Sequence, residues 1–175
     1  KKILECEKIL NYEFRDKSFL FEALTHSSYA YENKKKKNNE RLEFLGDAVL
    51  KLAVSDYLYL ENPAFDEGKM TKMRALIISD KTLAEIALDK KIGKVLFVSK
   101  REERSGGRKR HSILANALEA IFGAVYLDGG YQEAAKVIIT LLQKVLDCGE
   151  DISLLDFKSS FQELIQKENG TLPKY

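Results

Sequence analysis

The chain has 175 residues, of which 45% are hydrophobic and 32% charged. This composition suits one domain of ordinary size with a buried core, together with a fragment of a second unit. The formal net charge of +2 does not by itself indicate a nucleic-acid partner, so such evidence has to come from local charge clusters.

Compartment and membrane association can also be predicted from the sequence. Cys6 and Cys148 belong to no CxxC or Cys/His pattern, which argues against a disulfide framework or a zinc site. The charged, amphipathic first residues do not resemble a signal peptide. No apolar run reaches the roughly 20 residues that span a bilayer. We therefore expect a soluble, cytoplasmic protein with no membrane partner.

Helical periodicity without convincing strand alternation predicts an all-α fold. The expected helices cover, in chain order, 3–11, 18–31, 39–61, 67–78, 81–90, 113–127 and 131–146. Asp80 is the expected N-cap of the fifth, and Asp128-Gly129-Gly130 separates the last two. The charged, glycine-rich segment 100–112 is expected to form a loop.

Domain boundaries follow from this pattern. Residues 1–147 form the expected domain, and residues 148–155 form a linker. The segment 156–175 contains one amphipathic helix and half a strand, which cannot bury a core alone. It is expected to be the truncated start of another domain.

A stripe of acidic residues marks the helix expected over 39–61. Glu40, Glu43 and Asp47 are spaced i, i+3 and i+7, which places them on one side of a helix. A different, apolar stripe should face the core and contains Leu42, Leu45, Val49 and Leu52. Gly46 lacks a side chain and permits close approach of another helix.

Two interpretations of the acidic stripe remain open. It is either a solvated acidic face or a cation site. The like charges Glu43 and Asp47 at i, i+4 cost about 0.2–0.5 kcal/mol in helix stability. Clustered carboxylates coexist most easily with a bound cation or with a raised pKa.

A second helix carries a smaller polar pair. Asn116 and Glu119 are spaced i, i+3, opposite an apolar side formed by Leu114, Leu118, Ile121 and Val125. Small neighbours such as Gly123 let another helix approach Glu119. Oxygen donors without His or Cys suit Mg²⁺ or Mn²⁺. His26 and His111 form neither a Glu-x-x-His nor an HExxH pattern, which argues against di-iron and zincin sites.

The segment NERLEFLGD, residues 39–47, resembles the signature motif of the ribonuclease III family. Further matching segments follow the same order along the chain: ALTHSSY (23–29), DEGKMTKMRA (66–75), SGGRKRHSILA (105–115) and LEAIFGAVYLD (118–128). The resemblance covers about residues 3–147. The segment 156–175 resembles the first helix and strand edge of a double-stranded-RNA-binding domain.

The resemblance implies the ribonuclease III endonuclease fold as a helical homodimer. It implies cleavage of double-stranded RNA with Mg²⁺ or Mn²⁺, leaving 5′-phosphate and 3′-hydroxyl ends, in the processing of ribosomal and messenger RNA. The implied catalytic and metal-ligating residues are Glu43, Asp47 and Glu119, with Asn116 at a ligand position where the family usually has Asp.

Several residues outside the metal site also acquire expected roles from the resemblance. Glu40 matches an acid near the dimer interface, and Glu67 matches one associated with the site across the dimer. Phe44 is expected to pack into the partner subunit. Arg108, Lys109 and Arg110 are expected to contact RNA phosphates, although a merely solvated loop fits the same residues. Asn116 keeps one alternative open, a ribonuclease-like protein that binds double-stranded RNA without cleaving it.

Overall fold

The computed structural model describes residues 1–34 and 37–147, and the described residues form an all-α domain. The predicted linker and the predicted start of a second domain, residues 148–175, lie outside this range. The helices are α1 (Lys2–Leu10), α2 (Lys17–Ala23), α3 (Ser27–Glu32), α4 (Glu40–Glu61), α5 (Glu67–Ile77), α6 (Asp80–Asp89), α7 (Ile92–Val95), α8 (Lys100–Arg104), the 3-10 turn η1 (Gly107–Lys109) and α9 (His111–Asp147).

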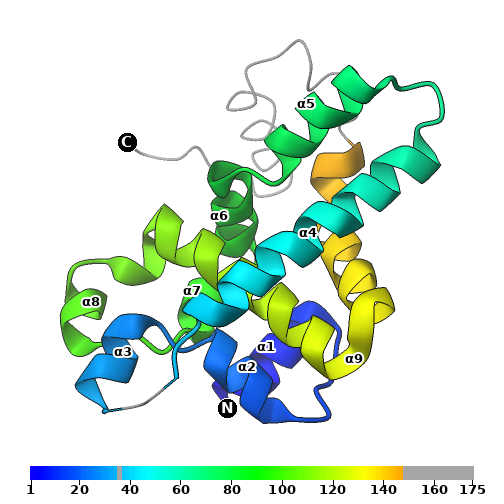
Figure 1. Cartoon of the computed structure of the whole chain (residues 1–175). Coiled ribbons are helices and arrows are strands. Elements are labelled where there is room, and N and C mark those ends of the chain that lie inside the picture. Colours follow the sequence, from blue (N-terminus) through cyan, green and yellow to red (C-terminus); the bar gives the residue numbers. More distant parts are fainter. Residues whose placement is uncertain (35–36, 148–175) are drawn as a thin grey trace.

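The two long helices α4 and α9 cross in the middle of the domain and make its most extensive packing contact (Figure 1). Buried apolar residues along α9 form much of the core, among them the predicted Leu114, Leu118, Ile121 and Val125. α6 and α2 also pack on α9, and α5 lies along the far half of α4. A polar site on these two helices therefore rests on the best-packed part of the fold.

The prediction of one helix over 18–31 is wrong, because the chain breaks between α2 and α3. Thr25 forms an isolated parallel bridge with Phe97, and the His26 backbone N–H donates to the Phe97 carbonyl at 3.0 Å. His26 is then the N-cap of α3, since its ring accepts from the Ser28 backbone N–H. These contacts hold the start of the signature segment, where the Asn39 N–H donates to the Thr25 carbonyl.

Three other sequence-based expectations need correction. Ser79, not Asp80, is the N-cap of α6, because the Ser79 side chain accepts from the Thr82 N–H. Leu52 does not face the core, since 53% of it is exposed. The segment expected to be a loop contains α8 and η1, and the Ser99 side chain caps α8 by accepting from the Glu102 N–H.

The division of the last two predicted helices is confirmed. α9 is continuous by hydrogen bonding but kinks at Gly130, whose φ of 82° and ψ of −179° are non-helical and suit only glycine. α9 is long and apolar enough to be a membrane-span candidate by length and composition, yet 61% of its most apolar window is buried inside the domain. Burial in the core accounts for that apolar character.

Candidate active site

The site begins with two glycines at the point where α4 crosses α9. A Cβ added to Gly46 would overlap the backbone carbonyl oxygen of Glu119, and one added to Gly123 would overlap the carbonyl oxygen of Leu42. The two backbones are therefore in direct contact, as the glycines in both segments predicted. This contact places Glu43 and Asp47, which flank Gly46, beside Glu119 on the facing helix.

Glu119 lies in the most strongly perturbed environment of the site. Burial raises the pKa of its carboxyl to about 7, and the nearby charges of Asp47, Glu43 and Asp80 push in the same direction. Lys51 opposes them weakly. A carboxyl held in this way, among other carboxylates and partly out of water, is the environment that a bound cation relieves.

Glu43 and Asn116 form the second half of the site. Burial raises the pKa of Glu43, while a side-chain hydrogen bond from Asn116 lowers it, and Glu40, Asp80 and Asp47 raise it further. The Asn116 amide thus donates to a carboxylate that would otherwise face only like charges. Sequence spacing paired Asn116 with Glu119, and the fold brings Asn116 to Glu43 as well.

The donor chemistry of this site fits a hard divalent cation, because all four polar side chains offer oxygen. As the side chains lie, no three His, Cys, Asp or Glu residues within the described ranges converge closely enough to hold a metal. Two contacts account for this, since Asp47 pairs with Lys51 at 2.6 Å and Glu43 is bonded to Asn116. The metal-ligating roles of these residues remain predictions.

Asp80 is the acid that sequence reasoning missed. It occupies the first position of α6, and α6 packs along α9. Its negative charge acts on both Glu43 and Glu119. No local spacing in the sequence connects Asp80 with these residues. The sequence shows only an acidic residue at a helix start, which usually stabilises its own helix by interacting with the helix dipole.

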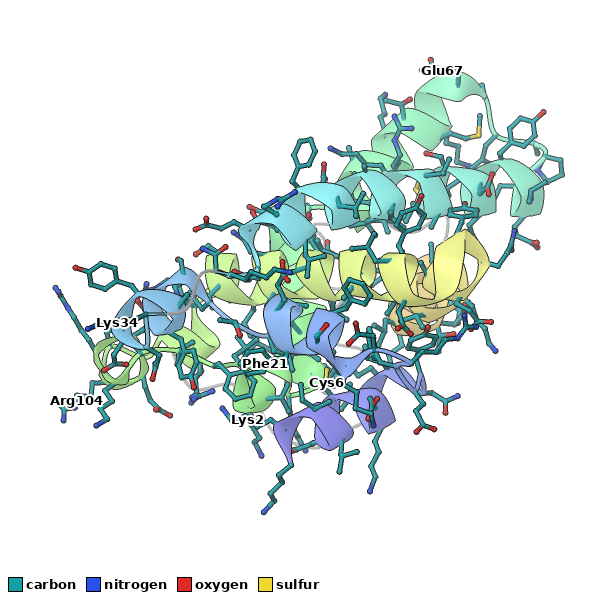
Figure 2. The ribbon with its side chains drawn as sticks, turned by 60° about the horizontal axis from the view of Figure 1, so that its bottom comes forward. Lys2, Cys6, Phe21, Lys34, Glu67 and Arg104 are labelled. Carbon is teal, nitrogen blue, oxygen red and sulfur yellow. The ribbon has the colours of Figure 1, made fainter. Side chains whose placement is uncertain are left out.

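The two outlying acids lie in different places. Glu40 lines a small pocket of about 200 Å³ together with Glu43, Asn116 and His26. Glu67 lies at the start of α5, at the opposite end of the molecule from α3 and α8, as Figure 2 shows. Within one chain the fold therefore does not bring Glu67 to the site.

The basic side chains in and next to η1 differ in whether they are bonded within the domain or exposed to a ligand. Arg108 is largely used internally, because its Nη1 donates to the Gly93 and Leu96 carbonyl oxygens and its Nε pairs with Glu103 at 2.7 Å. Arg110 lines the small pocket beside Glu43 and is half-exposed. Lys109 is exposed. The expected RNA contacts stay predictions, but this geometry favours Arg110 over Arg108.

The raised pKa of Glu119 gives a pH prediction for protein stripped of metal by EDTA. A folded-state pKa of about 7 lies above the usual value of 4.5, so the folded state holds a proton that the unfolded state has released. This stabilisation is complete below about pH 4.5 and is lost as the pH rises through about 7.

Thermal unfolding from pH 5 to 8 measures this loss. Glu119→Gln, which cannot ionise, should flatten the decline in melting temperature between pH 5 and 7. An unchanged decline in Glu119→Gln would contradict the assignment.

Comparison with known proteins identifies the family. A family model described as ribonuclease-III-like matches residues 16–146. Ribonuclease 3 of Pelotomaculum thermopropionicum is 49% identical over 169 residues, which covers 95% of this chain and 70% of that protein. Ribonuclease 3 of Fusobacterium nucleatum is 46% identical over 178 residues, covering 100% of this chain and 76% of that one.

A solved structure gives the same result. The nuclease domain of ribonuclease III from Campylobacter jejuni, reported with structural flexibility in a region involved in dimer formation, has 44% sequence identity and a TM-score of 0.76. The match covers 81% of this chain and 96% of that domain. The signature segment therefore lies on α4 in a domain with the fold that its resemblance implied, and the chain belongs to the ribonuclease III family of endoribonucleases.

Proposed function

We propose that this chain hydrolyses the phosphodiester backbone of double-stranded RNA with Mg²⁺, or with Mn²⁺ in its place, leaving 5′-phosphate and 3′-hydroxyl ends. The observation that carries the proposal is the gathering of oxygen donors from α4 and α9 at the Gly46 crossing. When bound, the metal supplies an activated water and stabilises the leaving oxygen, so neither a histidine base nor a covalent nucleophile is needed.

The chain's own residues hold the reacting groups in place. Glu43 and Asp47 present carboxylates from α4, while Glu119 and Asn116 present oxygens from α9. The backbone contact at Gly46 fixes the spacing of the two sets. Arg110, at the wall of the adjoining pocket, would hold RNA phosphate beside an otherwise acidic surface.

The basic test is incubation of a long RNA duplex with the protein and Mg²⁺, with end-group analysis of the products. EDTA and a DNA duplex of the same sequence are the controls. The second candidate function, binding of double-stranded RNA without cleavage, is favoured only by Asn116 and predicts a shifted but intact duplex. In the cell, we propose a cytoplasmic role in the processing of ribosomal and messenger RNA.

The exposed face of α4 supports a homodimer. Phe44 is 82% exposed and Tyr59 is 72% exposed, and Leu52 lies on the same side of the helix. A pocket of about 410 Å³ between α4 and α5 is lined in part by Leu58, Tyr59 and Met70. In a twofold dimer each subunit offers both features to the other.

If Phe44 of one subunit occupies this pocket of the other, the dimer also determines where Glu67 lies relative to the acidic site. Glu67 lines the same pocket, and Glu43 adjoins Phe44 in sequence. The dimer would therefore bring Glu67 of one subunit beside the acidic site of its partner, which gives Glu67 a role that a single chain does not.

Truncating the exposed aromatic tests this dimer. Phe44→Ala should weaken self-association by about 1–3 kcal/mol, because an anchor that fills a partner's pocket contributes on that scale. Sedimentation across a concentration series measures the shift. Leu4→Ala removes another exposed apolar side chain, on α1 and away from this face, and should leave the dimer unchanged. A wild-type monomer at high micromolar concentration would refute the dimer.

The asparagine at position 116 gives a prediction with a direct binding measurement. Asn116→Asp replaces an amide donor with another anionic oxygen, which Mg²⁺ prefers. The Mg²⁺ or Mn²⁺ concentration needed to raise the melting temperature halfway should fall, and the concentration needed for half-maximal cleavage should fall with it.

In EDTA the same variant should be less stable than the wild type, because it adds a charge beside Glu43. Coincident metal titrations of the two proteins would show that position 116 is not a ligand.

A further inference from the structure

Lys51 places a positive charge directly at the acidic site. Its Nζ donates to Asp47 Oδ2 at 2.6 Å, from one turn further along α4. Long side chains on a helix lean toward its N-terminus, so the Lys51 stem runs back along α4 toward Asp47. The charge also reaches the facing helix, because Lys51 lowers the pKa of Glu119 against the three acids that raise it. The ammonium therefore acts on an acid of α4 and on an acid of α9.

The ion pair between Lys51 and Asp47 competes with metal binding. Pairs at i, i+4 are common on helix surfaces and contribute little to stability, but this carboxylate belongs to a predicted metal ligand. A divalent ion binds carboxylate oxygens directly, at about 2.0–2.1 Å for Mg²⁺. An ammonium 2.6 Å from Asp47 Oδ2 would repel such an ion. Metal on the Asp47 carboxylate and the ion pair with Lys51 therefore oppose each other.

The Lys51 side chain is placed so that a metal can displace it. It is 53% exposed, and the side chain of Asp47 is 38% exposed. Lysine carries its compact ammonium on a flexible four-carbon stem. An ammonium exposed to this extent regains water when it leaves, so its displacement costs little.

We propose that Lys51 is a tethered counter-ion of the metal site, which neutralises the Asp47 carboxylate in the metal-free protein and is displaced by the bound cation. This inference rests on the metal-ligating part of the proposed function. Lys51 then has two opposite effects, since it stabilises the protein without metal and weakens metal binding. Asn116 acts in the same direction on metal binding, because it offers a neutral oxygen in place of an anionic one. Both residues raise the metal concentration at which the site fills.

Direct metal binding tests the counter-ion. Mn²⁺ binding to metal-stripped protein is followed by the loss of the free-ion signal in electron paramagnetic resonance. Lys51→Met keeps the apolar stem and removes the charge, so the dissociation constant for Mn²⁺ should fall about two- to fivefold, the factor that an exposed ion pair contributes. In EDTA the same variant should melt about 1–4 °C lower than the wild type. Lys51→Arg keeps the charge and should bind Mn²⁺ as the wild type does.

Lys17 provides the matched control, because it is 45% exposed and pairs with Glu7 at 3.1 Å, outside the acidic site. Lys17→Met should lower the melting temperature and leave the dissociation constant for Mn²⁺ unchanged. The displacement itself is followed by the rate at which an amine-reactive reagent labels each lysine, quantified by mass spectrometry. Mn²⁺ should increase the labelling of Lys51 and leave that of Lys17 unchanged.

The outcomes separate the counter-ion from the proposed function. Tighter Mn²⁺ binding by Lys51→Met alone, with faster labelling of Lys51 in Mn²⁺, supports the inference. An unchanged or larger dissociation constant in Lys51→Met, an equal fall in Lys51→Arg, or unaltered labelling of Lys51 overturns the counter-ion and leaves the metal site standing. Absence of Mn²⁺ binding by the wild-type protein overturns both the counter-ion and the metal-dependent proposed function.

Discussion

Replacing Glu119 with alanine is expected to reduce cleavage of double-stranded RNA at least about 10²–10³-fold, the scale on which loss of one transition-state-stabilising group acts. Glu119 lies where α9 touches α4, and burial, with the charges of Asp47 and Glu43, raises the pKa of its carboxyl to about 7. Without Glu119, α9 offers no carboxylate to a cation that Glu43 and Asp47 of α4 would bind. Single-turnover cleavage of a long RNA duplex in Mg²⁺ measures the loss.

The control for this variant is a carboxylate on the same pair of helices but away from the site. Glu61 is exposed at the far end of α4, so Glu61→Ala should cleave at the wild-type rate. Glu119→Ala should also keep its helical circular dichroism, and in EDTA it should melt no lower than the wild type, because a destabilised charge has gone. Cleavage by Glu119→Ala within tenfold of the wild type would exclude Glu119 from the catalytic machinery.

Adding one methyl group at Gly46 is expected to be among the most damaging substitutions in the domain. The Cβ of Gly46→Ala would overlap the Glu119 carbonyl oxygen and approach the Gly123 backbone nitrogen at 2.9 Å. Both are backbone atoms, so no side-chain rotation relieves the overlap, and α4 must move away from α9. We expect the free energy of unfolding to fall by about 3 kcal/mol or more, measured by urea denaturation.

Gly68 provides the matched control, because it also lies in a helix but has space around it. A Cβ there would meet only the Asp66 carboxylate, at an ordinary distance of 3.6 Å. Gly68→Ala should therefore stabilise the protein by roughly 0.5–1 kcal/mol, as alanine restricts the unfolded chain and favours the helix. Equal effects of the two substitutions would show that the α4–α9 contact is looser than described.

The Gly46 variant also separates stability from assembly of the site. Moving α4 from α9 increases the distance from Glu43 and Asp47 to Glu119, so cleavage should decline even at temperatures where the variant is fully folded. Retained activity in a folded Gly46→Ala protein would mean that the site tolerates the shift.

The sequence by itself determined the features that depend on spacing along the chain. The intervals between Glu40, Glu43 and Asp47 place these carboxylates on one side of any helix they form. Gly46 and Gly123 predicted a close helix contact, and Gly130 marked the kink in α9. The signature segment predicted the family, because its residues combine the acids, the glycine and the apolar stripe in one short stretch.

Only the tertiary structure decided which of these features meet. Asp80 acts on Glu43 and Glu119 because the start of α6 packs on α9, and no interval in the sequence encodes that contact. Leu52 follows the apolar periodicity of α4 yet is exposed, because none of the helices in residues 1–34 and 37–147 covers that part of α4. The Arg108 guanidinium donates to backbone carbonyl oxygens rather than to solvent, because η1 packs against α7. Local periodicity fixes the side of a helix on which a residue lies, whereas the long-range fit of apolar surfaces fixes what that side faces.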